Sequence, residues 1–344
     1  MKVIRASTLF GNTLLLLATL VSVAQAQRPA EWRSASAAEQ ALDAAAFAGI
    51  DQAIRDDAPD VQSAVVVLQG RVVYEFYRDG SPETLRNVHS VAKSALSTLV
   101  GIALGQGHLA SLDQPVVSLL PEWAGLNADP RAAAITVRHL LTMTAGFEVD
   151  DPTGTAPAGK PQDAWKRPMR NDPGRAFAYD NALIPVLSVV LEKATGMPVQ
   201  DYARRHLVEP LALAEPSYRQ GLGMRTLDMA KLGQLHLQDG QWAGRQILPE
   251  AYVREATRRW SEGGLPLSLP YGYMWWVVRS NAVRPTFMAA GYGGQFVWVY
   301  PPLDLVIATT SAVSRGAPQR FQAMKLIRGP LYAAAQRRAK ELPR

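Results

Sequence analysis

A serine and a lysine stand three residues apart in the stretch His89-Ser90-Val91-Ala92-Lys93-Ser94. In a helix this spacing puts both side chains on one face, one turn apart, so the amine of Lys93 can reach the hydroxyl of Ser90. A serine hydroxyl is a weak nucleophile until a base takes its proton, and a neutral lysine can be that base. The pair therefore predicts a serine nucleophile if burial and the helix dipole bring the lysine pKa from about 10.4 to roughly 7–8.

A second interpretation makes Ser90 only the N-cap of the helix. A capping box would place Glu or Gln three residues later, whereas Lys93 in the first turn faces the helix dipole unfavourably. This local cost favours a chemical use for the lysine. Ser-x-x-Lys alone does not specify an enzyme, so both interpretations stay open at this point.

A tyrosine and an asparagine form a second short motif, Tyr179-Asp180-Asn181. Tyr179 can be read as a core tyrosine, and Asn181 as the N-cap of the helix that follows it. That helix is predicted to run through about Thr195, because Gly196 and Pro198 stand just beyond it.

Strand patterns at both ends of the chain enclose a helical middle, and the elements that must position these residues follow from periodicity. We expect strands at 63–68 and 71–77 joined by a Gln69-Gly70 turn, and further strands at 271–278, around Gly291, at 295–300 and at 305–310. Helices are expected in 27–60, at 90–107, after Thr136, near 199–209, 226–238 and 249–259, and at 318–337. This order predicts an α+β fold, with a mainly antiparallel sheet built from the N- and C-terminal segments and flanked by helices.

The predicted sheet domain comprises residues 27–85 and 226–344, and a mainly helical domain, 86–225, is inserted into it. Both motifs lie in the inserted domain. Residues 151–175 are rich in Pro, Gly and Asp, and a loop of this length is more typical of a functional segment than of a linker. We expect it to shape specificity.

Residues 1–26 resemble a secretory signal, with Lys2 and Arg5, an apolar run at 14–23, and Ala24-Gln25-Ala26 as the cleavage site. The expected location is therefore the periplasm or the exterior, and no later stretch is apolar enough to predict a stable membrane span. The net charge is +6, but the basic residues are scattered, which does not favour a nucleic-acid partner.

Thiol and histidine chemistry find little support in the composition. The chain has no cysteine, which excludes a thiol nucleophile and a cysteine-zinc site. It carries neither a Gly-x-Ser-x-Gly nor a His-Glu-x-x-His motif, so we expect no metal and no organic cofactor. His89, Trp165 and Trp275 are candidate pocket walls, as is Trp276, although a core role is equally consistent with the paired tryptophans.

Ser-x-x-Lys followed by Tyr-x-Asn resembles the serine β-lactamase and penicillin-binding protein superfamily. The similarity is to its class C-like branch, with the related esterases and 6-aminohexanoate-oligomer hydrolases, and it spans roughly residues 60–310. Flanking stretches at 135–147, 173–179, 240–249 and 271–276 are also similar. The resemblance implies the β-lactamase/transpeptidase-like fold and makes Ser90 the acylated nucleophile, Lys93 its general base and Tyr179 the acid or base for the leaving group. It also implies that Asn181 holds Lys93 and the substrate.

The family's third motif is a Lys-Thr-Gly or His-x-Gly triplet, whose counterpart here is Ala289-Ala290-Gly291, followed by Tyr292-Gly293. The resemblance implies an oxyanion hole from the backbone N–H groups of Ser90 and Tyr292, with Gly291 and Gly293 beside the substrate. A glycine-rich bulge closing a strand would explain the same residues.

The cation that normally meets a substrate carboxylate in β-lactamases and D-alanyl peptidases is replaced by alanine, and Arg170 or Arg284 could supply a substitute. We therefore expect an exported serine hydrolase that cleaves a small-molecule ester or linear amide through an acyl-enzyme. A β-lactamase or D-alanyl peptidase is the alternative. A non-catalytic binding protein for peptides or cell-wall fragments is the alternative from another class.

Overall fold

The computed structural model describes residues 32, 35–151, 153, 157–278, 282–313 and 319–341. The predicted signal at 1–26 lies outside the described residues. None of the described helices combines the length and the apolar character that a membrane crossing requires.

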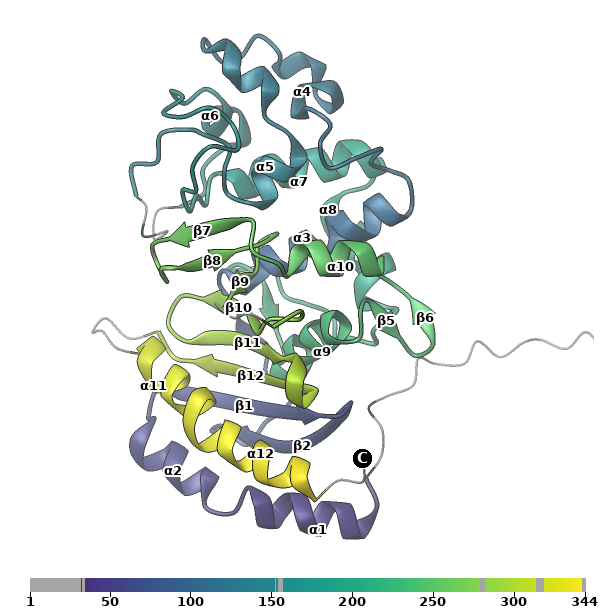
Figure 1. Ribbon diagram of the computed structural model, residues 1–344, viewed down its shortest axis with the longest axis vertical. Coiled ribbons are helices and arrows are strands. Elements are labelled where there is room, and N and C mark those ends of the chain that lie inside the picture. The colour runs from purple at the N-terminus through teal and green to yellow at the C-terminus, as the bar shows by residue number, and fades with distance from the viewer. Residues whose placement is uncertain are drawn as a thin grey trace, which may run out of the picture.

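An eight-stranded antiparallel sheet extends from the middle of the molecule, at β7, towards its lower end, at β2, in the order β2-β1-β12-β11-β10-β9-β8-β7 (Figure 1). Its strands are β1 Val61–Leu68, β2 Arg71–Tyr77, β7 Ser261–Gly264, β8 Leu269–Tyr271, β9 Trp276–Val277, β10 Phe287–Gly291, β11 Gln295–Tyr300 and β12 Leu305–Ser311. β1 pairs with β2 on one side and with β12 on the other, so the two ends of the chain share one sheet, as the sequence predicted.

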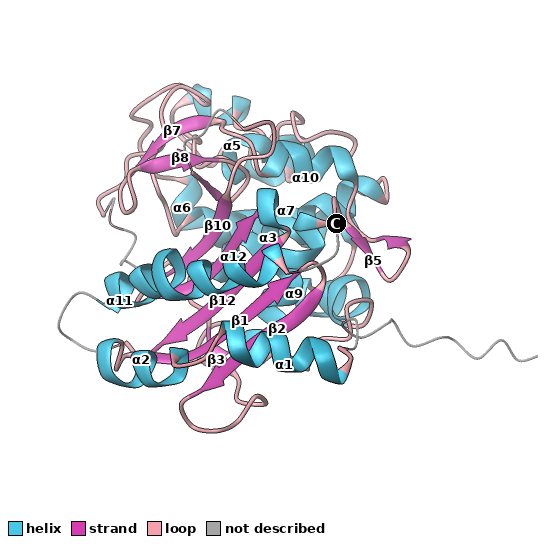
Figure 2. Cartoon of the chain, turned by 60° about the horizontal axis from the view of Figure 1, so that its bottom comes forward, coloured by secondary structure: helices cyan, strands magenta, loops and turns pink. Residues whose placement is uncertain are grey.

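Helices cover both faces of this sheet (Figure 2). On one face lie α1 Ala37–Ala46, α2 Ile50–Asp57, α11 Gln319–Leu326 and α12 Tyr332–Lys340, and α9 Thr226–Leu237 packs on the other. β1 is a valine-rich strand that is almost wholly buried, as a strand covered on both faces must be. A Cβ at Gly233 of α9 would lie 2.6 Å from a methyl group of Val297, so this glycine lets the helix approach the sheet closely.

The helical part contains α3 Val91–Gly105, α4 Val116–Leu119, η1 Pro121–Trp123, η2 Pro130–Ala134, α5 Val137–Leu141, α6 Pro161–Trp165, α7 Leu183–Thr195, α8 Val199–Ala203 and the π-helical turn η3 Arg204–Val208, with α10 Glu250–Ala256 beside it. The short strands β3 Arg86–Asn87 and β4 Gly223–Met224 pair where the chain enters and leaves this part. α3 packs against α7 and also against β10 and β11. It therefore joins the helical part to the sheet, and the predicted domain boundaries stay a prediction.

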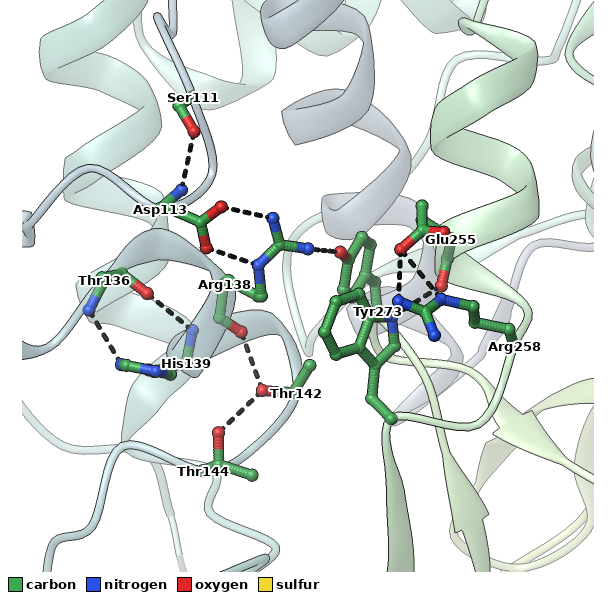
Figure 3. A network of polar contacts seen from close by, with 11 residues as sticks. Ser111, Asp113, Thr136, Arg138, His139, Thr142, Thr144, Glu255, Arg258 and Tyr273 are labelled. Atoms are coloured by element: carbon green, nitrogen blue, oxygen red, sulfur yellow. Dashed lines mark hydrogen bonds and ion pairs between the residues drawn. The ribbon is translucent and has the colours of Figure 1, made fainter. Parts of the chain in front are cut away.

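A polar network beside α5 ties the two parts together (Figure 3). The guanidinium of Arg138 donates to both carboxylate oxygens of Asp113, over 2.6 and 2.7 Å, and to the hydroxyl of Tyr273. The backbone N–H of Met274 also donates to the carbonyl of Leu141 over 3.0 Å. The turn after β8 is thus fixed to the helical part.

The prediction of one strand over 271–278 is wrong, because this turn divides the segment into β8 and β9. The chain folds back between β8 and β9, and Tyr271 pairs with Trp276. Met274 adopts a left-handed φ of 59° within the turn. A Cβ at Gly272 would lie 2.1 Å from the carbonyl oxygen of Ala256, so only glycine allows this close approach.

The single closing helix expected at 318–337 is also wrong. α11 and α12 are separated by the segment Ile327–Leu331, in which Gly329 is non-helical and Pro330 follows it. Proline lacks the N–H that a continuous helix needs and clashes with the preceding turn. Short strands that the sequence did not indicate are β3, β4, β7 and the ribbon of β5 Gln241–Trp242 with β6 Arg245–Gln246.

Candidate active site

Ser90 lies at the N-terminus of α3, directly after a strained turn. His89 has a φ of 47°, and its backbone N–H donates to the side chain of Asn87 over 2.8 Å. Ser90 occupies the N-cap position, but its hydroxyl makes no capping bond to the helix. The capping interpretation is therefore not supported, and the hydroxyl is available to other partners.

Lys93 is the first of those partners. Its Nζ donates to Ser90 Oγ over 2.8 Å and to Asn181 Oδ1 over 2.7 Å. The lysine is buried, which lowers its pKa to about 7, while the nearby charge of Asp180 acts in the opposite direction. The Asn181 carbonyl can only accept, so it takes an N–H of the amine in either protonation state. The lone pair of the neutral amine is then left for the Ser90 proton.

Tyr179 completes the polar group around Ser90. Burial raises its pKa to about 12, and a side-chain hydrogen bond with Ser90 opposes that shift. The ring centroid lies 4.9 Å from Lys93 Nζ and 5.7 Å from the ring of Trp276, on which it stacks. Tyr179 is therefore a fixed, protonated phenol at neutral pH, able to give a proton to a leaving group.

Asp180, between these two residues, has a different set of contacts. Its buried carboxylate accepts a hydrogen bond from Arg167 Nη2 over 2.5 Å and another from the backbone N–H of Ala182 over 2.9 Å. Ala182, and not Asn181, is the N-cap of α7. Asp180 and Arg167 were not among the predicted site residues, although a charged residue inside the Tyr-x-Asn motif was a signal for them.

Three cavities meet at these side chains. The first has a volume of about 180 Å³ and mostly apolar walls, which include Trp276 and Leu265 beside Ser90 and Tyr179. The second, of about 920 Å³, shares Ser90 and Tyr292 with the first. Its walls include His89, Lys93, Asn181, Asn87 and Gln220. The third, of about 370 Å³, shares Tyr179 and Leu265 with the first.

The counterpart of the third motif lies against the turn that carries Ser90. A Cβ at Gly291, the last residue of β10, would lie 2.4 Å from the carbonyl oxygen of Val88. Tyr292 is 54% exposed, lines the first two cavities, and packs edge-on against His89. Gly293 follows with a φ of 81°. The oxyanion-hole role of the Tyr292 N–H stays a prediction.

Two of the expected pocket walls are core residues instead. Trp165 is 1% exposed and packs against Trp123, and Trp275 is fully buried against His236. The expectation for both was wrong, and Trp276 lines the first cavity. Successive residues of an extended chain point to opposite sides, so Trp275 faces the core where Trp276 faces the site.

The two arginines considered as substitutes for the missing cation lie in different places. Arg170 lines the third cavity, next to the site. Arg284 pairs with Asp239 over 3.0 Å and donates to the carbonyl of Leu237, at the end of α9. Thr153 lines the first cavity and Pro157 the second, so the loop 151–175 contributes walls to all three. Among the described residues, no group of three or more histidine, aspartate or glutamate side chains could hold a metal ion.

The sheet, the inserted helices and the site between them define a protein of the β-lactamase/transpeptidase fold. A family model described as Beta-lactamase matches residues 36–226, and the chain belongs to this family, whose members are serine hydrolases. A penicillin-binding protein homologue from Caulobacter crescentus shares the fold with a TM-score of 0.66 and 17% identity, over 89% of this chain and all of that one.

Two curated relatives extend the comparison. Esterase EstB of Burkholderia gladioli is 29% identical over 206 residues, 51% of this chain and 52% of the esterase. The acyltransferase calJ of Penicillium decumbens is 26% identical over 170 residues, 42% of this chain and 41% of the relative. This chain therefore spans only about half of the length of these two relatives or less.

Proposed function

We propose that the protein hydrolyses a small-molecule ester or amide through an acyl-enzyme on Ser90. The observation that carries the proposal is the buried amine of Lys93, within hydrogen-bond distance of both Ser90 Oγ and Asn181 Oδ1. Because burial lowers the lysine pKa to about 7, a large fraction of the amine is neutral near neutral pH and can accept the serine proton.

In acylation, Ser90 Oγ attacks the carbonyl carbon as its proton passes to Lys93 Nζ. The backbone N–H groups of Ser90 and Tyr292 receive the oxyanion, a contribution worth about 2.7–4 kcal/mol per donor in other enzymes. The bond to the leaving group then breaks, and the leaving alkoxide or amine takes a proton from Tyr179, which Lys93 can reprotonate. The acyl group stays on Ser90.

In deacylation, water attacks the ester carbonyl on Ser90. The water proton passes through Tyr179 to the neutral Lys93, the bond to Ser90 Oγ breaks, and the serine oxygen takes the proton back. These residues and one water molecule supply every group that the two half-reactions need. Tyr179 and Lys93 lie close enough to titrate as a pair, so the proton belongs to both during this cycle.

The walls of the site favour an ester or a linear amide over a β-lactam. Ala289 of β10 stands where the triplet of the family has its cation, and Arg284 is paired at the end of α9. The first cavity is small and mostly apolar, which suits a short acyl group. We also propose export, on the signal-like sequence of residues 1–26.

The test uses the purified protein and its Ser90→Ala variant with a short-chain p-nitrophenyl ester, a linear amide, a cephalosporin reporter and a fluorophosphonate. We expect turnover of the ester or amide, and a fluorophosphonate adduct by intact mass, in wild type only. Preferred turnover of the cephalosporin would select the β-lactamase alternative. A folded wild-type protein without adduct or turnover would favour the non-catalytic binding protein.

The second cavity supports a second candidate function, acyl transfer to an alcohol. Its volume of about 920 Å³ leaves room beside Ser90 for an acceptor larger than water, and one relative is named an acyltransferase. We expect added alcohols to raise the ratio of ester to free acid among the products. A ratio no higher than that of uncatalysed alcoholysis would overturn this candidate.

A further inference from the structure

Arg167 links three segments around the catalytic motif. Its Nε donates to the carbonyl of Ala164 over 3.0 Å, and its Nη1 donates to the carbonyl of Glu148 over 3.3 Å. The guanidinium lies over the ring of Phe147, 5.1 Å from the centroid. These contacts hold the charge of Arg167 in one place, where its remaining partner is Asp180.

Asp180 is the anion next to the base. It is 5% exposed, and it stands between Tyr179 and Asn181, both of which contact Lys93. A carboxylate in this position attracts a proton to the lysine. A protonated lysine cannot accept the serine proton, so the charge of Asp180 opposes catalysis unless it is neutralised.

We propose that Arg167 is a positioning residue for the catalytic base: it cancels the charge of Asp180 beside Lys93 and fixes the turn that holds Asn181 against the lysine. This inference rests on the proposed function. The carboxylate also accepts from the N–H of Ala182, so the Arg167–Asp180 pair sets the start of α7 as well as the local charge.

The other charged or titratable groups around Lys93 do not provide this neutralisation. Tyr179 and His89 are near, and burial raises the pKa of Tyr179 and lowers that of His89, which keeps both uncharged at neutral pH. β10 and β11 carry no charged residue. The charges of α7, Glu192 and Lys193, lie in its last turn. In η3, His206 lies beside Gln106 at the far end of α3, and Arg204 pairs with Glu215.

The test measures the rate of fluorophosphonate labelling of Ser90 against pH, by intact mass, together with kcat/KM for the best ester. Arg167→Met leaves Asp180 unneutralised and so raises the pKa of Lys93. The acid limb of the pH profile, where the labelling rate falls as the lysine is protonated, should therefore move to higher pH by on the order of one unit. Asp180→Asn removes the anion and should move the limb to lower pH. The double variant, with neither charge, should return towards wild type, and Arg167→Lys should restore most of the wild-type profile.

Arg131→Met is the matched control. Arg131 belongs to the same helical part and pairs with Asp129 and Asp172, so its loss should leave the acid limb in place. Circular dichroism verifies that each variant is folded. Equal rate losses in Arg167→Met and Asp180→Asn without opposite movements of the limb would overturn the inference alone. Failure of wild type to label Ser90 would overturn the proposed function and this inference together.

Discussion

The amine of Lys93 donates to the side-chain carbonyl of Asn181 over 2.7 Å, although the two residues are 88 positions apart in the chain. One lies in the first turn of α3 and the other just before α7, two helices that pack against each other. The contact fixes an otherwise flexible lysine side chain at 2.8 Å from Ser90 Oγ. The base is therefore positioned by helix packing as well as by the local Ser-x-x-Lys spacing.

Asn181→Ala should lower kcat/KM by about 10- to 100-fold, because the amine loses the acceptor that orients it. Asn181→Asp keeps an acceptor at the same place but adds a negative charge beside Lys93. We expect this variant to move the acid limb of kcat/KM to higher pH. Steady-state kinetics across pH on the ester substrate test both. Values within twofold of wild type for Asn181→Ala would contradict a positioning role.

Lys93→Met should abolish labelling of Ser90 and stabilise the folded protein. The unfolded chain holds the lysine proton up to pH 10.5 and the folded protein only up to about 7, so this group makes wild-type stability rise with pH between those values. The gain of Lys93→Met should be largest at and below pH 7, on the order of 4 kcal/mol, and should shrink towards pH 10.

Urea unfolding of wild type and Lys93→Met at pH 7 and pH 9 measures this effect. Ser90→Ala is the control, because it removes catalysis but leaves the amine of Lys93 buried against Asn181, and its unfolding free energy should still rise with pH. A stability difference between wild type and Lys93→Met that does not change with pH would show that the folded protein holds the lysine proton as tightly as the unfolded chain.

The local parts of the site followed from the sequence and the long-range parts did not. The spacing of Ser90 and Lys93, the hairpin at Gln69-Gly70 and the stop at Gly196 depend on residues within one or two turns, where helix and turn geometry decide the outcome. The burial of Trp165 and the pairing of Asp180 depend on segments that only the tertiary structure brings together. The break at Gly329-Pro330 was not predicted, although the sequence indicates it, because proline interrupts a helix.

Gly291→Ala should lower kcat/KM by more than about 100-fold while the protein stays folded. The added methyl group would lie 2.4 Å from the backbone oxygen of Val88, so the end of β10 and the turn before Ser90 must separate. The measurement is kcat/KM with circular dichroism on the same sample. Gly125→Ala is the matched control, because nothing lies within 4 Å of a Cβ there, and it should keep wild-type activity. Wild-type activity in Gly291→Ala would show that this approach is not required.

Asp43→Asn should destabilise the protein without changing catalysis. The buried carboxylate of Asp43 on α1 bridges two buried arginines: Arg71 of β2, whose Nη2 lies 3.0 Å from Oδ1, and Arg338 of α12, whose Nε lies 2.7 Å from the same oxygen. Replacing the carboxylate with an amide leaves both guanidinium groups buried without their shared anion. Removing one partner of a buried ion pair costs about 3–5 kcal/mol of unfolding free energy.

Arg254→Met is the control. It breaks an exposed pair with Glu250 and should cost less than about 1 kcal/mol. Because α1 and α12 cover the face of the sheet away from α9, kcat/KM of folded Asp43→Asn at 25 °C should match wild type. A fall in kcat/KM would instead show that the terminal helices set the position of the strands beside Ser90.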